Sequence, residues 1–227
     1  MTEQSFPEER ENPEESACRV APFAGTVTGG KERIAVFVIA GQIEGHQSAP
    51  TGVKTTRYEH LLPLLAEAEE DPKIHGVLLL INTVGGDVEA GLCLAEMIAG
   101  LQKPTAALVL GGGHSIGIPL AVAARHSFIV PSATMTVHPV RITGLVLGVP
   151  QSFEYLARMQ DRICDFVVAH SRIKREKLDE LMAGQSDMAT DVGTILRGKE
   201  AVELGLIGGI GGFADAVAAL KAEGKRP

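Results

Sequence analysis

Residues 105–124, with the sequence TAALVLGGGHSIGIPLAVAA, decide the fold of this chain. Thr105–Leu110 is short and apolar, which predicts a buried strand, and Gly111–His114 predicts a glycine-rich turn. Ser115–Ala124 then predicts a helix. The stretch is uncharged over about the length that could span a bilayer. Because three glycines and a histidine interrupt it, we interpret it as a strand, turn and helix of a globular core, without an integral membrane segment.

The same order of elements precedes this stretch. Val77–Ile81 is an uninterrupted apolar run, as expected of a parallel strand that is covered on both faces. Gly85-Gly86 predicts a second turn, and Asp87 is placed to cap the helix that follows. Two successive strand–turn–helix units, in a chain that alternates strands and helices, predict an α/β fold with a largely parallel sheet. Ligands of such sheets bind at the carboxyl ends of the strands, where we expect the functional residues.

Further apolar runs extend the pattern on both sides. Tyr58–Glu70 has helical spacing, and Asp71-Pro72 predicts its end, because the residue before proline is biased away from the helix. Val149–Ser171 predicts a helix that is unusually long for a domain of this size. Its apolar stripe favours contact with another subunit or packing on the core of its own subunit. The remaining predicted elements are strands at Ile34–Ala40, Phe128–Val130, Met135–Val137 and Leu204–Ile207, a turn region at Gly41–Gly45, and helices at Ile173–Met182 and from Phe213 onward.

Charge is concentrated at the N-terminus. The formal net charge is −7 over 227 residues, and six glutamates against one arginine in residues 1–16 supply −5 of it, which leaves −2 for the body. The composition of residues 1–30 predicts a flexible acidic tail, followed by one domain at residues 31–227. Nucleic-acid binding needs several cations to displace phosphate counterions, and the body has no stripe of Lys and Arg. We therefore expect no nucleic-acid partner.

The cysteines bear on metal binding and on the cellular compartment. Cys18, Cys93 and Cys164 are widely spaced. Their odd number and the lack of a CxxC pair favour neither a disulfide framework nor a thiolate zinc site, so we expect no metal. The acidic N-terminus has no basic region followed by an apolar segment, which excludes a standard secretory signal. We expect a reducing, cytoplasmic location.

One short motif suggests a nucleophile. Gly113-His-Ser-Ile-Gly117 satisfies the GxSxG pattern, in which glycines permit the sharp strand-to-helix turn that exposes a serine hydroxyl. A close-packed structural turn gives the same pattern, because serine beside glycine is common. The apolar strand before Ser115 and the apolar helix after it supply the context that a nucleophile needs. Ser115 is therefore the candidate.

A serine hydroxyl becomes a useful nucleophile only when a neighbouring base removes its proton. His138 ends the predicted strand Met135–Val137 and precedes Pro139, so it lies at a strand end, where a sheet presents functional side chains. The other histidines considered are predicted to lie on the surface or to point away from the serine: His114, His126 and His170. His138 is the candidate base, and a purely structural histidine is the alternative.

An acyl-transfer intermediate also needs preorganised N–H donors for its oxyanion, and the loss of one donor typically costs ~3–4 kcal/mol. One candidate donor is the N–H of Ile116, directly after the nucleophile. The other lies in Gly85-Gly86, where the absence of side chains lets the backbone approach a substrate. A plain turn at the start of a helix is the alternative interpretation of the two glycines.

Four segments together resemble the proteolytic subunit family of the Clp protease. Ile81-Asn-Thr-Val-Gly-Gly-Asp-Val-Glu-Ala-Gly91 is similar to the INSPGGxVxAG segment of that family, and Ser115-Ile-Gly117 is similar to its SMG turn. Met135-Thr-Val-His138 resembles its MIHQP segment, and Glu200-Ala-Val-Glu-Leu-Gly-Leu-Ile207 resembles its EAVEYGLVD ending. The segments occur in the family's order over residues 32–212.

The resemblance implies an α/β fold of the ClpP/crotonase-like type, built of stacked βαβ units with a protruding long handle helix. Val149–Ser171 is placed to form that handle. The resemblance also implies a Ser–His–Asp triad, a homo-oligomeric ring that encloses a proteolytic chamber, and an AAA+ ATPase as a candidate partner. Peptides or unfolded proteins are the implied substrates, and no cofactor is implied.

The chain departs from the family pattern at several positions. Val84 replaces a proline, and His114 precedes the serine where the family usually has alanine. The glutamine that the family has between histidine and proline is missing. Counting back from the ending motif to the family's triad acid gives Gly193. We assign Asp191 as the acid, which assumes a local two-residue insertion, with Asp187 as the alternative.

These departures resemble the divergent branch of translocation-enhancing proteins, and so do Gly41-Gln-Ile-Glu-Gly-His46 and Thr190-Asp-Val-Gly-Thr194. Resemblance to that branch implies a peptidase linked to protein export or turnover. A serine endopeptidase is therefore the leading hypothesis. The alternative is a catalytically silent ring subunit or binding scaffold that has the same fold.

Three other enzyme classes fit the sequence less well. A Ser–Lys peptidase would need a lysine near the nucleophile, and none occurs between Ser115 and Arg172. An acyl-CoA hydratase or isomerase would use glutamates at the turns, and Glu89 is the only near candidate. An α/β-hydrolase has the chain order Ser, Asp, His, which would require His170 as the base.

Overall fold

A mostly parallel sheet forms the centre of the structure. The computed structural model describes residues 24–29, 32–141, 148–184 and 193–223. The sheet order is β1-β2-β4-β5-β6-β9, in which neighbours from β2 to β9 are parallel and β1 pairs with β2 antiparallel. The bounds of these strands are Ala24–Gly29 for β1, Glu32–Glu44 for β2, Ile74–Gly86 for β4, Thr105–Gly113 for β5, His126–Ile129 for β6 and Gly209–Ile210 for β9.

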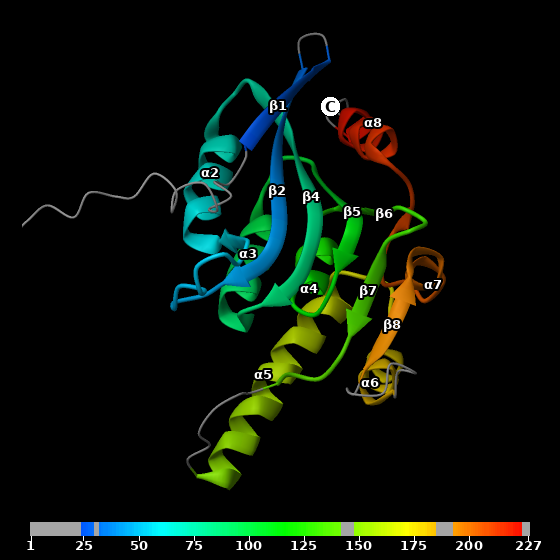
Figure 1. The fold of residues 1–227 in the computed structure, drawn as a ribbon. Helices are drawn as coiled ribbons and strands as arrows, with labels where there is room; N and C mark the ends of the chain where they lie inside the picture. Colours follow the sequence, from blue (N-terminus) through cyan, green and yellow to red (C-terminus); the bar gives the residue numbers. More distant parts are fainter. Residues whose placement is uncertain (1–23, 30–31, 142–147, 185–192, 224–227) are drawn as a thin grey trace, which may run out of the picture.

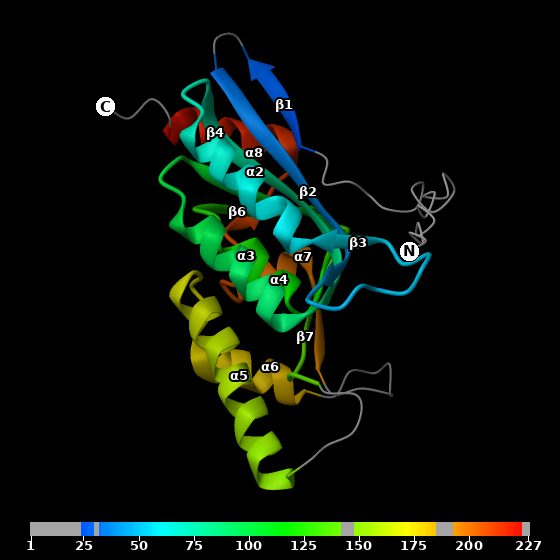
Figure 2. The ribbon, with the colours of Figure 1, turned by 90° about the vertical axis from the view of Figure 1, so that its left-hand side faces the viewer.

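Helices cover both faces of this sheet (Figures 1 and 2). The successive connections contain α2 (Tyr58–Glu70), α3 (Val88–Gly100) and α4 (Gly117–Val122), whose buried side chains share one large core with the sheet. On the other face, α8 (Phe213–Glu223) packs Ala216 and Leu220 against the sheet. The predicted α/β fold with a largely parallel sheet is confirmed.

The strand β4 illustrates why the sheet is buried. Neighbouring residues of a strand point to opposite faces. Leu79 accordingly packs in the core under α2 and α3, and Leu78 packs in the core under α8. Both side chains are fully buried. Burying one such side chain stabilises the fold by roughly 1.5–3 kcal/mol.

A second, smaller layer carries part of the site. β7 (Thr134–Val137) follows β6 and pairs antiparallel with β8 (Thr194–Arg197), and β7 also joins β5 through one parallel bridge at Gly112. β8 was not expected from the sequence. The remaining elements are β3 (Thr55–Arg57), which pairs with β2, α6 (Arg175–Ala183) and α7 (Gly198–Glu203).

The helix α5 (Val149–Ala169) projects from the body in both ribbon views (Figures 1 and 2). Its 21 residues make it about 31 Å long at the usual rise per residue. Cys164 and Val167 in its C-terminal half are buried in the large core. Near its N-terminus, Val149 is 72% exposed and Phe153 is 74% exposed. The predicted long handle helix is confirmed.

Three sequence predictions require correction. Residues 24–29 were assigned to the flexible tail, but they form β1, because six residues of β2 provide backbone partners for them. Gly41–Gly45 is not a separate turn, since β2 continues through a register shift at Gly41 and ends at Glu44. Leu204–Ile207 is not a strand. It is a turn in which the N–H groups of Leu206 and Ile207 donate to the carbonyl of Ala201.

The predicted N-terminal tail and the possible membrane span have different outcomes. Residues 1–23 of the predicted flexible tail lie outside the described residues. Among the described helices, none is both long enough and apolar enough to cross a membrane. The uncharged stretch at residues 105–124 forms β5 and α4, as expected of a strand, turn and helix.

Candidate active site

Ser115 lies in a tight turn between β5 and α4. Its φ angle is 56°, and it is the one non-glycine residue with positive φ in the described part of the chain. Its N–H donates to the carbonyl of Thr136 on β7 at 2.9 Å, and Gly117 N–H donates to the carbonyl of His114 at 2.9 Å. Left-handed backbone at a non-glycine residue is strained, and such strain concentrates at functional sites. The turn has the conformation expected of a nucleophile elbow.

The Gly85-Gly86 turn lies directly against the serine. A Cβ atom at Gly85 would be 2.6 Å from Ser115 Cβ, so only glycine fits there, and its φ of 91° also favours glycine. Thr83 holds this turn in place. Its Oγ1 accepts from Gly85 N–H at 3.1 Å and donates to the carbonyl of Gly41 at 2.6 Å.

The backbone N–H of Ile116 is available for a ligand. It donates to no acceptor among the described residues, whereas the N–H groups on either side of it, at Ser115 and Gly117, are bonded. The Ile116 side chain is buried, and a Cβ at Gly91 would overlap its Cγ1. Ile116 and Gly86 line the same cavity as Ser115. These contacts hold an unpaired donor next to the nucleophile.

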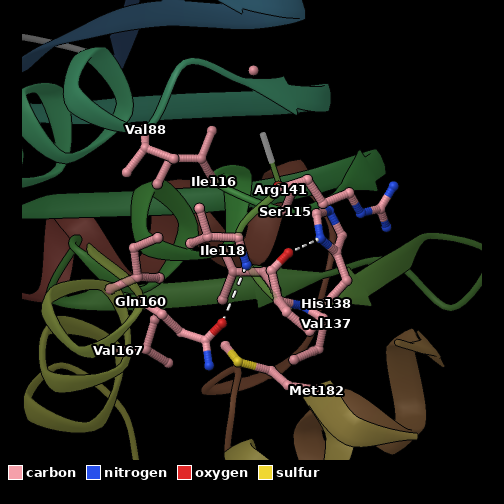
Figure 3. A pocket seen from close by; sticks show the side chains of 14 residues that line it. Val88, Ser115, Ile116, Ile118, Val137, His138, Arg141, Gln160, Val167 and Met182 are labelled. Atoms are coloured by element: carbon pink, nitrogen blue, oxygen red, sulfur yellow. Dashed lines mark hydrogen bonds between the residues drawn. The ribbon is translucent and has the colours of Figure 1, made fainter. Parts of the chain in front are cut away.

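His138 follows β7 and lines that cavity together with Ser115. Its Nδ1 is 2.7 Å from the carbonyl oxygen of Pro139, and Figure 3 marks this contact with a dashed line. A carbonyl only accepts hydrogen bonds, so Nδ1 carries the proton and Nε2 is left as the basic nitrogen of the neutral ring. Ser115 Oγ makes no hydrogen bond to any described residue.

His114 adjoins the serine but its ring is bonded elsewhere. Its Nδ1 is 2.8 Å from Thr136 Oγ1. Burial lowers the pKa of His114 below its ordinary value of 6.5, and the nearby charge of His138 lowers it further. A neutral ring bonded to Thr136 agrees with the expectation that His114 points away from Ser115.

Gly193, the residue reached by counting back from the ending motif, lies next to His138. The antiparallel register pairs Val137 with Thr194, so residue 193 lies opposite His138. A Cβ at Gly193 would be 2.6 Å from the carbonyl oxygen of Val137 and 2.7 Å from His138 Cβ. No side chain fits there without displacement of the backbone. The predicted acid Asp191 and its alternative Asp187 lie outside the described residues.

The cavity itself is small and largely apolar, with a volume of about 120 Å³. In Figure 3, Ser115 and His138 lie on one side of it and Gln160 and Val167 on the other. Gln160 Oε1 accepts from Val140 N–H at 3.2 Å. The apolar lining residues are Val88, Ile116, Ile118, Val137, Ile163, Val167 and Met182. The sequence does not indicate that α5 and α6 contribute to this lining, although the apolar stripe of α5 is visible in it.

Three residues considered in the sequence analysis lie elsewhere. His126 Nε2 is 2.8 Å from Glu223, and His170 Nδ1 is 2.8 Å from the carbonyl of Phe166. Both carboxylate oxygens of Glu89 accept from Arg162, at 2.6 and 3.0 Å, and this contact holds its pKa below 4.5. None of the three considered residues lines the cavity of Ser115.

Comparisons with known proteins show the family of the chain. The family description "Clp protease" matches residues 43–212. The translocation-enhancing protein TepA of Halalkalibacterium halodurans is 55% identical over 187 residues, which are 82% of this chain and 73% of that protein. The ATP-dependent Clp protease proteolytic subunit 1 of Chlamydia muridarum is 28% identical over 140 residues, which are 59% of this chain and 69% of that protein.

A solved structure shows the same fold. It is an asparagine-to-aspartate mutant of ClpP1 from Listeria monocytogenes, with a TM-score of 0.63 and 20% sequence identity. The likeness covers 80% of this chain and 94% of that one. The fold is therefore the ClpP/crotonase-like fold that the sequence resemblance implied. By its family match and its translocation-enhancing relative, the chain belongs to the Clp protease family.

Proposed function

We propose that this protein is a serine endopeptidase of the Clp type, with Ser115 as nucleophile and His138 as general base. One observation carries the proposal. The strained turn that exposes Ser115 opens into the cavity that His138 also lines. A serine, a histidine with a free Nε2 and an unpaired N–H at Ile116 are the groups that acyl transfer requires.

The proposed reaction proceeds through an acyl-enzyme. The proton of Ser115 Oγ passes to His138 Nε2 as Oγ attacks the peptide carbonyl, and the N–H groups of Gly86 and Ile116 bind the oxyanion. His138 then gives the proton to the leaving amine, which departs. Water hydrolyses the acyl group by the same steps, and the free serine is regenerated.

The shape of the site supports a peptide as the substrate. An apolar cavity of ~150 Å³ holds a benzene molecule, so the present cavity suits one aliphatic or aromatic side chain. A more open groove of about 670 Å³ adjoins it and shares the lining residues Gly86, Val88, Val140 and Arg141. An extended peptide or an unfolded segment would occupy both.

The wider setting is proposed from the relatives. We propose a homo-oligomeric ring, a cytoplasmic location, and an AAA+ ATPase as an optional partner, because the matched relatives are named as subunits of an ATP-dependent protease. A role in export or turnover follows the name of the translocation-enhancing relative. Asp191, the sequence candidate for the third member of the triad, lies outside the described residues, and the described acceptor at His138 Nδ1 is the carbonyl of Pro139.

The second candidate function is a catalytically silent ring subunit or binding scaffold. Two observations favour it. Gly193 stands at the family's acid position, and Ser115 Oγ makes no hydrogen bond to His138. A ring that binds unfolded chains without cleaving them would keep the fold and the groove.

The test is hydrolysis of fluorogenic peptides and unfolded casein by the wild type, Ser115→Ala and Ser132→Ala. Ser132 is exposed and does not line the cavity, so its variant is the matched control. We expect Ser115→Ala alone to abolish cleavage and labelling by a fluorophosphonate. Equal residual cleavage by both variants would refute the serine mechanism. An assembled but inactive wild type, by light scattering, would favour the scaffold.

A further inference from the structure

We propose that the main-chain carbonyl of Pro139, rather than a carboxylate, orients the imidazole of His138 in the active enzyme. The catalytic meaning of this inference rests on the peptidase function proposed above. Pro139 would then be a positioning residue, because its carbonyl acts on the substrate only through His138.

The contact between the two groups is the first argument. The 2.7 Å separation of His138 Nδ1 and the Pro139 oxygen is that of a good hydrogen bond. Because the carbonyl cannot donate, it selects the tautomer with the proton on Nδ1. This is the tautomer that the buried aspartate selects in a Ser–His–Asp triad, and Nε2 is left to accept the serine proton.

The second argument is the lack of room for a side chain at position 193, the described residue opposite His138. Gly193 lies opposite His138, and a Cβ there would be 2.7 Å from His138 Cβ. No Asp or Glu is among the described residues that line the cavity. Among the described residues, the acceptor that contacts Nδ1 of the ring is therefore the neutral carbonyl of Pro139.

The sequence around the histidine explains how the carbonyl reaches the ring. Pro139 follows His138 directly, whereas the resembled family has a glutamine between the two residues. Proline fixes its own φ near −65° and so limits the positions of its carbonyl. The next residue is also held, because Val140 N–H donates to Gln160 of α5. The carbonyl is restrained on both sides.

A neutral acceptor has a consequence for the rate. When Ser115 loses its proton, His138 becomes a cation, and a carboxylate stabilises that cation better than a carbonyl does. His138 is therefore correctly oriented as the base, but its cation is stabilised less than it would be beside a carboxylate. We expect slow hydrolysis with the usual dependence on Ser115.

Nitrogen-15 NMR of the full-length, histidine-labelled protein reads the tautomer directly. The His138 signals are assigned by their disappearance in His138→Gln. At a pH where the ring is neutral, we expect Nδ1 to have the shift of a protonated nitrogen and Nε2 that of an unprotonated one. Both shifts should be unchanged in Asp191→Asn and Asp187→Asn. A proton on Nε2 in the wild type, or its movement to Nε2 in either variant, would overturn the inference.

Two further variants test the role of the proline. Pro139→Gly frees the φ angle, so we expect a mixture of tautomers and a kcat lower by about tenfold with KM unchanged. Pro131→Gly, at an exposed proline after β6, is the matched control. A Pro139→Gly protein with the tautomer and kcat of the control would contradict the proposed role.

Kinetics separate the carbonyl from a distant acid. Asp191→Asn should leave kcat and KM within about threefold of the wild type. A fall in kcat by about 10⁴, as when a triad aspartate becomes asparagine, would show that a carboxylate orients the ring. The failure of the peptidase proposal is a different result. In that case no variant hydrolyses peptide, but the tautomer of His138 is still measured by NMR.

Discussion

Gly193 lies opposite His138 and has no room for a side chain. We predict that Gly193→Asp lowers stability and does not raise kcat. The residue has a φ of 137°, and any Cβ there meets the backbone of β7 and His138 Cβ. Backbone strain of this kind costs about 1–3 kcal/mol. Urea denaturation and peptide hydrolysis measure the two effects.

An alanine pair is the control for this prediction. Gly193→Ala should be destabilised like Gly193→Asp, because the conflict arises at Cβ. Gly100→Ala should be neutral or stabilised, since a Cβ at Gly100, at the end of α3, meets nothing within 4 Å. A rise in kcat in Gly193→Asp would show instead that the backbone adapts and that a carboxylate is accepted there.

We predict that His114 makes the stability of the fold depend on pH. Burial is the main reason that its pKa lies below 6.5, and His138 adds to the effect. As pH falls through 6.5, the unfolded chain binds a proton at this position that the folded chain does not bind. The folded state therefore loses stability on acidification, and it keeps the full contribution at higher pH. The free energy of unfolding should fall less between neutral and acidic pH in His114→Ala than in the wild type.

A matched variant makes that comparison specific. His60 is an exposed histidine of α2, so His60→Ala should keep the pH dependence of the wild type. Equal pH dependence in His114→Ala and the wild type would mean that His114 titrates alike in both states.

At the scale of elements, one arginine joins α6 to the handle helix. Arg175 hydrogen-bonds to Asp161 and Asp165 on α5 and to Asp179 on its own helix. These bonds, chiefly the one to Asp161, raise the pKa of the guanidinium. We predict that Arg175→Gln lowers the free energy of unfolding by about 1 kcal/mol, a modest value because the partners are exposed and screened.

The measurement is urea denaturation at low and high salt. The loss should shrink at high salt, because screening already weakens the network there. Lys177→Gln is the control, since Lys177 makes a single exposed pair with Glu180. A loss in Arg175→Gln no greater than in the control would mean that the network does not fasten α5 to α6.

The elements that the sequence predicts best are those with local signals. The helix Tyr58–Glu70 was predicted at its observed bounds, because apolar spacing and Asp71-Pro72 mark it locally. The Asp87 cap was also correct, and its side chain accepts from Ala90 N–H. Strands were predicted too short. β4 continues to Gly86 because β2 and β5 provide its backbone partners. These strands are distant from β4 in the sequence, so the local pattern of β4 does not indicate the pairing.

The same distinction applies to the candidate site. Ser115 and His138 follow local motifs, and the structure brings both to one cavity. The opposite wall of the cavity comes from α5 and α6, so its residues depend on packing between segments far apart in the sequence. The bond from His138 to Pro139 depends on one side-chain rotamer, which spacing in a sequence does not encode.

At the scale of the whole molecule, the handle helix leaves apolar surface uncovered. The C-terminal half of α5 is held by the core, whereas Val149 is 72% exposed and Phe153, one turn later on the same face, is 74% exposed. Contiguous exposed apolar side chains of this kind mark contact surfaces in soluble proteins. For the homo-oligomer proposed above, a helix that projects from the body can meet the same helix of a second copy, which is a self-complementary contact.

We predict that a charge at Phe153 weakens this contact between subunits. Phe153→Glu would bury a carboxylate in an apolar interface, which is unfavourable unless the charge is paired. We expect its particle mass in solution, measured by light scattering, to fall below that of the wild type while the subunit stays folded by circular dichroism. Gln151→Glu adds the same charge at an exposed position two residues earlier and should keep the wild-type mass. An unchanged mass in Phe153→Glu would exclude the exposed end of α5 as the surface that joins the subunits.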